Sequence, residues 1–535
     1  MILPGALLFL GTLIPANSDL PLTRAERSNY QETSTYQDVL DFLGQLQDSG
    51  ARIRIDFIGK STEGRDIPLV LVSNPPVATP QEAKKTGKAI VYIQANIHAG
   101  EVEGKESAQA LIRELSLGPL SPLLEKLILV VCPIYNIDGN ERFGEGSRNR
   151  PGQTGPDRVG VRANGQGLDL NRDCMKVASP EMGAVLKHVY NYWDPDIVMD
   201  LHTTNGTRHG YPLTYAPPLH PATYGPLLEF SRATFIPTVR RELQAQGMQT
   251  FDYGNAANRG GRRVWESFGA EGRYVTNYAG LRNRIGVLSE SMSYEPFENR
   301  VKDTTRFVTQ VLRTAATHAS DITKLTRDAD AAVTEWGLRP SIAPELAVRF
   351  ALAEGRVEGV LMEKPRAEGA PPNRGPVRDI EVVEMPVFDR FAATQSASFP
   401  AAYIVPKAEK AVVELLLLHG VVVEQITAPW SGEAQIFTID TFNEAAQPFQ
   451  NVRLATASGS FTALPTEAHP GSYLVRTAQP LGILAFSLLE PESTDGVLAW
   501  RKLASELAAG SRYPIAKVMT PVRASTVRVQ VAHSE

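Results

Sequence analysis

Two hydrophobic periods alternate along roughly the first 320 residues of this 535-residue chain. Apolar residues at helical spacing predict helices, and these lie at residues 36–47, 106–115, 181–190, 228–246 and 302–318. Short, near-continuous apolar runs are typical of strands covered on both faces, and these lie at residues 52–58, 67–72, 88–94, 127–134, 196–201 and 285–289. Strands that alternate with helices predict an α/β fold with a mainly parallel mixed sheet flanked by helices.

The pattern changes after about residue 325, where helical spacing becomes scarce and short strand-like segments take its place. Strands are expected at residues 347–352, 378–387, 411–418, 434–439 and 473–476, and one late helix is expected at 495–509. We therefore predict an α/β domain over residues 19–325 and a β-rich C-terminal domain over residues 326–535.

The N-terminus carries an uncharged, mostly apolar run at residues 2–15, followed by the small residues Ala16 and Ser18. Such a run before a small-x-small site is typical of a signal peptide, and it is short for a membrane-spanning helix. We expect residues 1–18 to be a signal peptide and the protein to be periplasmic or secreted, with no membrane span. The alternative is a buried N-terminal strand or helix.

Composition excludes little beyond nucleic-acid binding. The formal net charge is -5, from 54 Lys+Arg against 59 Asp+Glu, so no basic excess favours nucleic acid. The two cysteines, Cys132 and Cys174, are too few for a disulfide framework. Two buried thiols are favoured over a single bridge.

Candidate chemistry gathers where predicted strands end. His98 and Glu101 follow the strand at 88–94, His202 follows 196–201, and Glu290 follows 285–289. Ligands bind at the carboxyl ends of strands in open α/β sheets, and two His with one Glu form a known catalytic zinc set that leaves a position for water. Glu290 would then be free to act as a general base. The alternative is that these histidines are structural.

The order of these residues resembles that of the zinc carboxypeptidase family, the carboxypeptidase A/B-like metallopeptidases. His98-x-x-Glu101 comes first, followed by Asp169-Leu170-Asn171-Arg172, His202 and Glu290. The resemblance covers about residues 25–320 and implies a bacterial-type member with an extra C-terminal domain. It implies a hydrolase, a protease that cleaves C-terminal peptide bonds with one Zn²⁺ per chain.

The resemblance also implies a role for each matching residue. His98, Glu101 and His202 would hold zinc, and Asp169 would orient His98. Asn171 and Arg172 would bind the terminal carboxylate of the substrate. An upstream arginine would polarise the scissile carbonyl: Arg150 is preferred, with Arg148 and Arg162 as alternatives. Tyr278, with Tyr274 as an alternative, would close over the substrate.

Several departures from the family pattern leave alternatives. Asp173 stands where the family has Asn, and Glu295 rivals Glu290 as the base. The same zinc set would serve an amidase or deacylase that acts on acylated amino acids or cell-wall peptides. A metal-free binding protein on the same fold is a more distant alternative.

Overall fold

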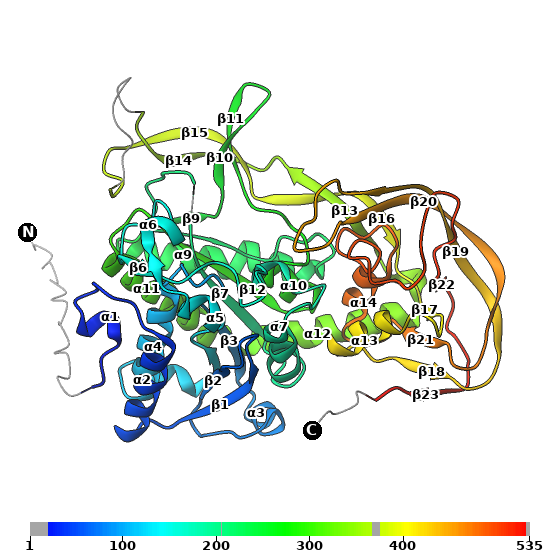
Figure 1. Ribbon diagram of the computed structural model, residues 1–535, viewed down its shortest axis with the longest axis horizontal. Helices are drawn as coiled ribbons and strands as arrows, with labels where there is room; N and C mark the ends of the chain where they lie inside the picture. Colours follow the sequence, from blue (N-terminus) through cyan, green and yellow to red (C-terminus); the bar gives the residue numbers. More distant parts are fainter. Residues whose placement is uncertain (1–19, 205, 366–374, 531–535) are drawn as a thin grey trace, which may run out of the picture.

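The computed structural model describes residues 20–204, 206–365 and 375–530. A large mixed sheet lies in the N-terminal part of the chain, and a second sheet lies beside it in the C-terminal part (Figure 1). The predicted signal peptide falls outside the described residues. Among the described residues, no helix is long and apolar enough to cross a membrane.

The large sheet has the strand order β1-β2-β4-β3-β7-β12-β8-β9. Its strands are β1 (Ile53–Lys60), β2 (Asp66–Val72), β3 (Ala89–Ala95), β4 (Leu127–Cys132), β7 (Ile197–Thr203), β8 (Leu213–Ala216), β9 (Thr250–Asp252) and β12 (Ile285–Ser291). The four central strands β4, β3, β7 and β12 run parallel, whereas β1, β2 and β8 pair antiparallel with their inner neighbours. The mainly parallel mixed sheet is therefore confirmed.

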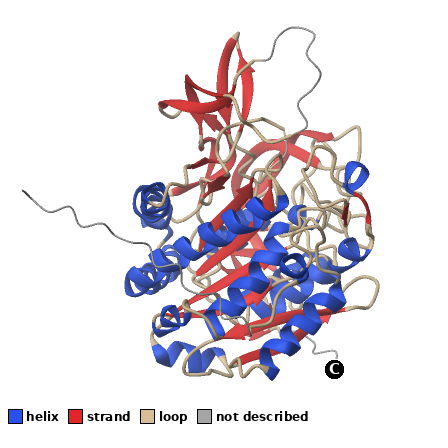
Figure 2. Cartoon of the chain, turned by 90° about the vertical axis from the view of Figure 1, so that its left-hand side faces the viewer, coloured by secondary structure: helices blue, strands red, loops and turns tan. Residues whose placement is uncertain are grey.

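Burial explains why the centre of this sheet is parallel. All residues of β3, β4, β7 and β12 are buried, as parallel strands require when helices cover both faces. Helices lie on both sides of the central strands (Figure 2). They are α2 (Tyr36–Asp48), α4 (Glu103–Ser116), α7 (Pro180–Val185), α9 (Ile236–Ala245), α10 (Val275–Leu281), α11 (Phe297–Thr317) and α12 (Ala319–Leu338).

The C-terminal part is rich in strands, as predicted. Its main sheet has the order β20-β19-β22-β17-β21-β18-β23. These strands are β17 (Ala402–Val405), β18 (Glu424–Ile426), β19 (Trp430–Glu444), β20 (Ala455–Ala468), β21 (Tyr473–Arg476), β22 (Ala516–Val518) and β23 (Thr526–Arg528), and β13 (Glu345–Ala353) pairs separately with β16 (Arg390–Ser398).

Two local predictions in this part are wrong. Residues 411–418 form helix α13 (Lys410–Leu418), because the buried residues Val412, Val413, Leu415 and Leu416 follow the helical rather than the strand period. Residues 495–509 form turns and irregular segments instead of a helix. Arg501 has a φ of 55° there, which is incompatible with a continuing right-handed helix. The late helix is instead α14 (Gly482–Leu489).

The two predicted domains share one small sheet. The hairpin β10 (Asn255–Arg259) and β11 (Arg262–Glu266) pairs through β11 with β15 (Ile380–Phe388), which in turn pairs with β14 (Val357–Glu363). Helix α12 also continues past residue 325. The division at 325/326 stays a prediction. Cys132 and Cys174 are buried and free, as expected.

Candidate metal centre and active site

The register of three neighbouring strands brings the candidate residues together. His98 and Glu101 lie on the turn that follows β3, and the Glu101 N–H donates to the His98 carbonyl at 2.9 Å. His202 lies near the end of β7, which pairs parallel with β3. Glu290 in β12 is the direct register partner of His202. Their positions therefore follow from the parallel centre of the sheet.

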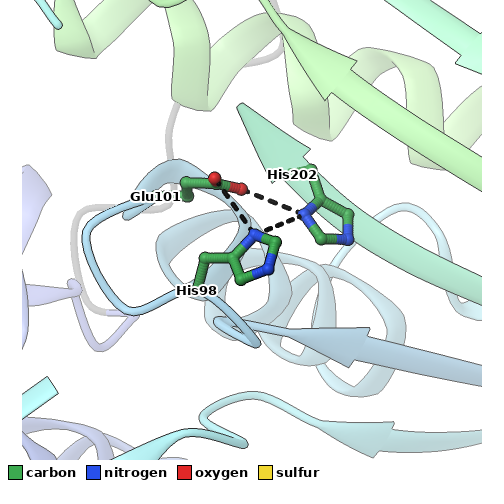
Figure 3. A group of neighbouring side chains, drawn as sticks. All are labelled: His98, Glu101 and His202. Atoms are coloured by element: carbon green, nitrogen blue, oxygen red, sulfur yellow. Dashed lines mark hydrogen bonds and ion pairs between the residues drawn. The ribbon is translucent and has the colours of Figure 1, made fainter. Parts of the chain in front are cut away.

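Three side chains converge on one point, as the close-up in Figure 3 shows. Nδ1 of His98 lies 3.1 Å from Oε1 of Glu101 and 3.1 Å from Nδ1 of His202, which lies 3.0 Å from Oε2 of Glu101. Ligands at 2.0–2.2 Å from a tetrahedral zinc lie ~3.3 Å from one another. Two imidazoles and one buried carboxylate at this separation fit a zinc ion. Within the described part of the chain, the ligand atoms of these three residues lie close enough together to hold a metal ion.

Each histidine is held from behind by a carboxylate. Nε2 of His98 lies 3.0 Å from Oδ1 of Asp169, and Nε2 of His202 lies 2.6 Å from Oδ2 of Asp200. A carboxylate on the distal nitrogen places the proton there and leaves Nδ1 free as a ligand. Asp169 thus lies where the family resemblance implies. Asp200 was missed, although its place two residues before His202 on one strand was a usable signal.

Electrostatics keep the carboxylate ligand ionised. Burial by itself raises the pKa of Glu101, but the Arg150 guanidinium and His98 outweigh it and hold this pKa well below its usual value. Nη1 of Arg150 lies 3.1 Å from Oε1 of Glu101. Nη2 of Arg150 donates to the Thr203 carbonyl at 2.6 Å, so the guanidinium is fixed from two sides.

The trio opens into a cavity of about 300 Å³ that also holds most of the other predicted residues. Those lining it are Arg150, Arg162, Asn171, Arg172 and Glu290. Arg162 also bridges Asp169 at 2.9 Å and Glu101 at 3.4 Å. Arg148 is exposed and does not line this cavity. Of the three candidate arginines, Arg150 and Arg162 thus line the cavity.

Glu290 is buried in this cavity with an uncommitted carboxylate oxygen. Its Oε2 has no hydrogen-bond partner within the described residues. Burial raises the pKa of Glu290 to about 8, and Glu101 adds to the rise, while His202 and Arg150 oppose it. The rival Glu295 does not line the cavity, and it accepts a hydrogen bond from Asn299 at the surface. The geometry favours Glu290 as the acid–base group.

Arg172 keeps donors available for an anion. Its Nη1 donates to the Asn171 carbonyl at 2.7 Å, and it lies 3.9 Å from the Asp169 carboxylate. The guanidinium lies over the Tyr274 ring, 4.4 Å from its centroid. Asp173, the other acidic neighbour, pairs with Lys176. Arg172 therefore has no close bidentate carboxylate partner within the described chain.

The structure does not bring Tyr278 to the cavity. Its side chain is fully buried, and its hydroxyl donates to Nδ1 of His419 at 2.7 Å. The aromatic residues that line the cavity are Tyr253, Phe268 and Tyr274. Tyr274 was the alternative on sequence grounds. Tyr253 and Phe268 flank the β10–β11 hairpin, and nothing in their local sequence singled them out.

Comparison with known proteins agrees with this geometry. Residues 39–184 match the zinc carboxypeptidase family model. Carboxypeptidase 2 of Trichophyton rubrum is 23% identical over 480 residues, covering 85% of this chain and 81% of its own length, and that of Trichophyton tonsurans is 23% identical over 491 residues, covering 86% and 81%.

Solved structures are also similar. A metallo-carboxypeptidase from Burkholderia cenocepacia aligns with a TM-score of 0.41 at 18% identity, over 54% of this chain and 70% of that one. The matched family segment contains His98, Glu101 and the Asp169–Arg172 motif. Residues 39–184, which carry two of the three candidate metal ligands, are thus similar to the zinc carboxypeptidase family.

Proposed function

We propose that this protein cleaves C-terminal residues from peptides with one zinc ion held by His98, Glu101 and His202, and with Glu290 as general base. The observation that carries the proposal is a single cavity that joins the ligand trio, the uncommitted Glu290 oxygen and the Arg172 guanidinium. A cavity with convergent polar groups of these kinds suits metal-assisted hydrolysis of an anionic substrate.

Glu290 would manage the protons of the reaction. Bound at the trio, zinc would supply Lewis acidity and lower the pKa of a coordinated water towards ~7. Oε2 of Glu290 would accept a proton from the attacking water and pass it to the leaving amine. Burial is the largest influence on the pKa of Glu290 and raises it, whereas Arg150 and Arg162 lower it. The charge of a bound zinc ion would add to that lowering and favour the ionised form that a general base requires.

Arg150 would stabilise the oxygen that becomes negative as the carbonyl is attacked. It is held in place before the substrate arrives by Glu101 and the Thr203 carbonyl. A preorganised donor of this kind contributes about 3–4 kcal/mol to transition-state binding. Arg162 lines the same cavity and is the second candidate for this role.

Arg172 and Asn171 would anchor the free carboxylate of the substrate. A guanidinium offers a planar pair of donors that matches a carboxylate. The ring of Tyr274 holds one face of the guanidinium. The enzyme would therefore recognise the C-terminal end of a peptide and not its interior.

The test compares hydrolysis of peptides with free and with amidated C-termini. Amidation would leave the Arg172 guanidinium without a carboxylate partner. It is therefore expected to weaken transition-state binding by about 2–5 kcal/mol, which lowers kcat/KM accordingly. Arg172→Ala should slow hydrolysis of the free acid and nearly abolish the acid/amide difference. The control is Arg313→Ala, which removes an exposed arginine on α11 and should leave that difference intact.

The outcomes separate the competing functions. Equal rates on free and amidated peptides in the wild type would refute the anchor. Rapid hydrolysis of N-acyl amino acids with slow hydrolysis of peptides would favour an amidase or deacylase. Absence of zinc after reconstitution would refute the enzyme proposal and favour the binding protein.

A further inference from the structure

The hairpin β19–β20 ends in a tight turn with an unusual residue at its tip. Phe449 and Val452 exchange two main-chain hydrogen bonds of 2.8 and 3.0 Å, so Gln450 and Asn451 form a two-residue turn. Both residues have positive φ, 50° for Gln450 and 65° for Asn451. Positive φ at both central positions defines a type I′ turn.

Glutamine is a poor choice for the first position of such a turn. Type I′ turns favour Asn, Asp or Gly, because a longer side chain is disfavoured in the left-handed region. The second position follows the rule with Asn451. Glutamine at the first position therefore calls for an explanation outside the turn.

The Gln450 side chain reaches the catalytic segment. Its Oε1 accepts a hydrogen bond of 2.8 Å from the main-chain N–H of Asp169, 281 residues away in sequence. The carboxylate of the same Asp169 holds His98 at 3.0 Å and accepts from the Asn171 N–H at 2.9 Å. Gln450 thus contacts the residue that connects a zinc ligand to the proposed carboxylate anchor.

The tip of the hairpin also contacts Arg273, the residue before the cavity-lining Tyr274. The Arg273 guanidinium lies 5.1 Å from the centroid of the Phe449 ring and 5.2 Å from that of Trp500. It also pairs with Asp495 at 2.8 Å in a buried position. Its neighbour Tyr274 supports Arg172. Residues from the C-terminal part therefore contact Asp169 and Arg273, which lie close in sequence to Arg172 and to Tyr274.

We propose that Gln450 is a positioning residue for the active site and that the C-terminal part of the chain thereby completes it. The Gln450 side chain fixes the main chain at Asp169, and Asp169 in turn orients His98 and the Asn171–Arg172 pair. The part concerning substrate rests on the proposed function, whereas the part concerning zinc affinity does not require turnover.

The decisive variant is Gln450→Asn. Asparagine suits the left-handed turn better than glutamine, but its side chain is one methylene shorter and withdraws from the Asp169 N–H. We expect an unchanged or higher melting temperature. Zinc affinity, measured by competition with a chelator, should fall about 3–10-fold, less than the 10–100-fold typical of groups that touch the ligands directly. KM for a free-acid peptide should rise about 10-fold at saturating zinc, with kcat changed less.

Two further variants separate the hydrogen bond from the turn. Gln450→Glu keeps an acceptor of the same length and should retain more zinc affinity than Gln450→Asn. Asn451→Gly changes the other turn residue, which has no hydrogen bond to the Asp169–Arg172 segment within the described residues, and should leave zinc affinity and KM unchanged.

Wild-type zinc affinity and KM in Gln450→Asn would overturn the proposal, as would an equal loss of zinc affinity in Gln450→Glu. A wild type that binds zinc but cleaves no peptide would refute the proposed function alone. The zinc affinities of the variants would still decide the role of Gln450.

Discussion

The large sheet and the β19–β20 hairpin both contribute to one site, by different physical means. The sheet supplies His98, His202 and Glu290 from the ends of parallel strands whose residues are all buried. Their positions follow from strand register, and a slip of one residue would turn every side chain to the opposite face. The hairpin contributes through one polar side chain, Gln450, at the end of a long extension.

The difference shows how chemistry and its support are divided in this protein. The proposed zinc ligands and the proposed base sit where many buried contacts fix them, so no single remote contact determines their position. The orientation of Asp169, in contrast, depends on individual hydrogen bonds from Arg162 and Gln450. Variants in the sheet should therefore abolish function, and variants in the C-terminal part should tune it.

The largest effect is expected where the sheet supplies a ligand. His202→Ala removes one of the three proposed zinc donors, and the lost Lewis acidity, worth several kcal/mol, should lower the rate by at least ~10³-fold. Elemental analysis after reconstitution should find about one zinc per chain in the wild type and much less in the variant. His469→Ala, at an exposed position of the C-terminal part, is the matched control. Full zinc occupancy in His202→Ala would remove this residue from the ligand set.

A somewhat smaller effect is expected at Glu290, the proposed proton-transfer residue. Glu290→Gln keeps the shape of the side chain but cannot take a proton, so kcat should fall ~10²–10⁴-fold with zinc content unchanged. Glu295→Gln changes the same residue type a few positions away and should have little effect. The assignment would have to be reversed if Glu295→Gln were the inactive variant.

Much of the sheet and its chemistry was predictable from sequence, because both follow periodicity. The runs at residues 88–94 and 196–201 are buried strands, and the polar residues after them meet at one edge of the sheet. Asp200 was missed because hydrophobic periodicity does not single out a polar residue inside a buried strand, and only its position two residues before His202 marked it. The hydrogen bond between Asp200 and the His202 ring appears only in the structure.

The C-terminal part was less predictable, because contacts distant in sequence determine it. Residues 495–509 have a helical pattern, yet Asp495 and Trp500 turn towards each other and towards Arg273. Tyr278 was expected near the substrate, but its partner His419 lies 141 residues further along the chain. No local sequence pattern indicates contacts between residues so far apart along the chain. The contact of Gln450 with Asp169 could not be predicted for the same reason.

The smallest expected effect is on the pH dependence of stability. It tests whether a neutral histidine, His419, helps to hold the C-terminal part against the large-sheet part of the chain. His419 is fully buried at the end of α13. Its Nε2 donates to the Met175 carbonyl at 3.1 Å, so Nδ1 accepts from the Tyr278 hydroxyl. Burial lowers the pKa of His419 from 6.5 to about 3, and the nearby Arg282 contributes to the shift. Between these pH values the unfolded chain binds a proton at this histidine that the folded chain does not.

The sign of the pH dependence follows from that difference. The stability due to a neutral His419 is fully present above pH 6.5 and is lost as pH falls towards 3, at about 1.4 kcal/mol per pH unit. The His419→Gln side chain does not titrate and keeps a donor for the Met175 carbonyl. The free energy of unfolding, measured with denaturant between pH 7.5 and 5, should therefore fall less steeply with pH than in the wild type.

Two other buried histidines, His209 and His220, have pKa values lowered by burial to about 4 and about 3, and they contribute equally to both proteins. The difference between the slopes therefore isolates His419, and His469→Gln at an exposed position should leave the slope unchanged. Parallel slopes for wild type and His419→Gln would show that His419 does not link acid sensitivity to the contact between the two parts of the chain.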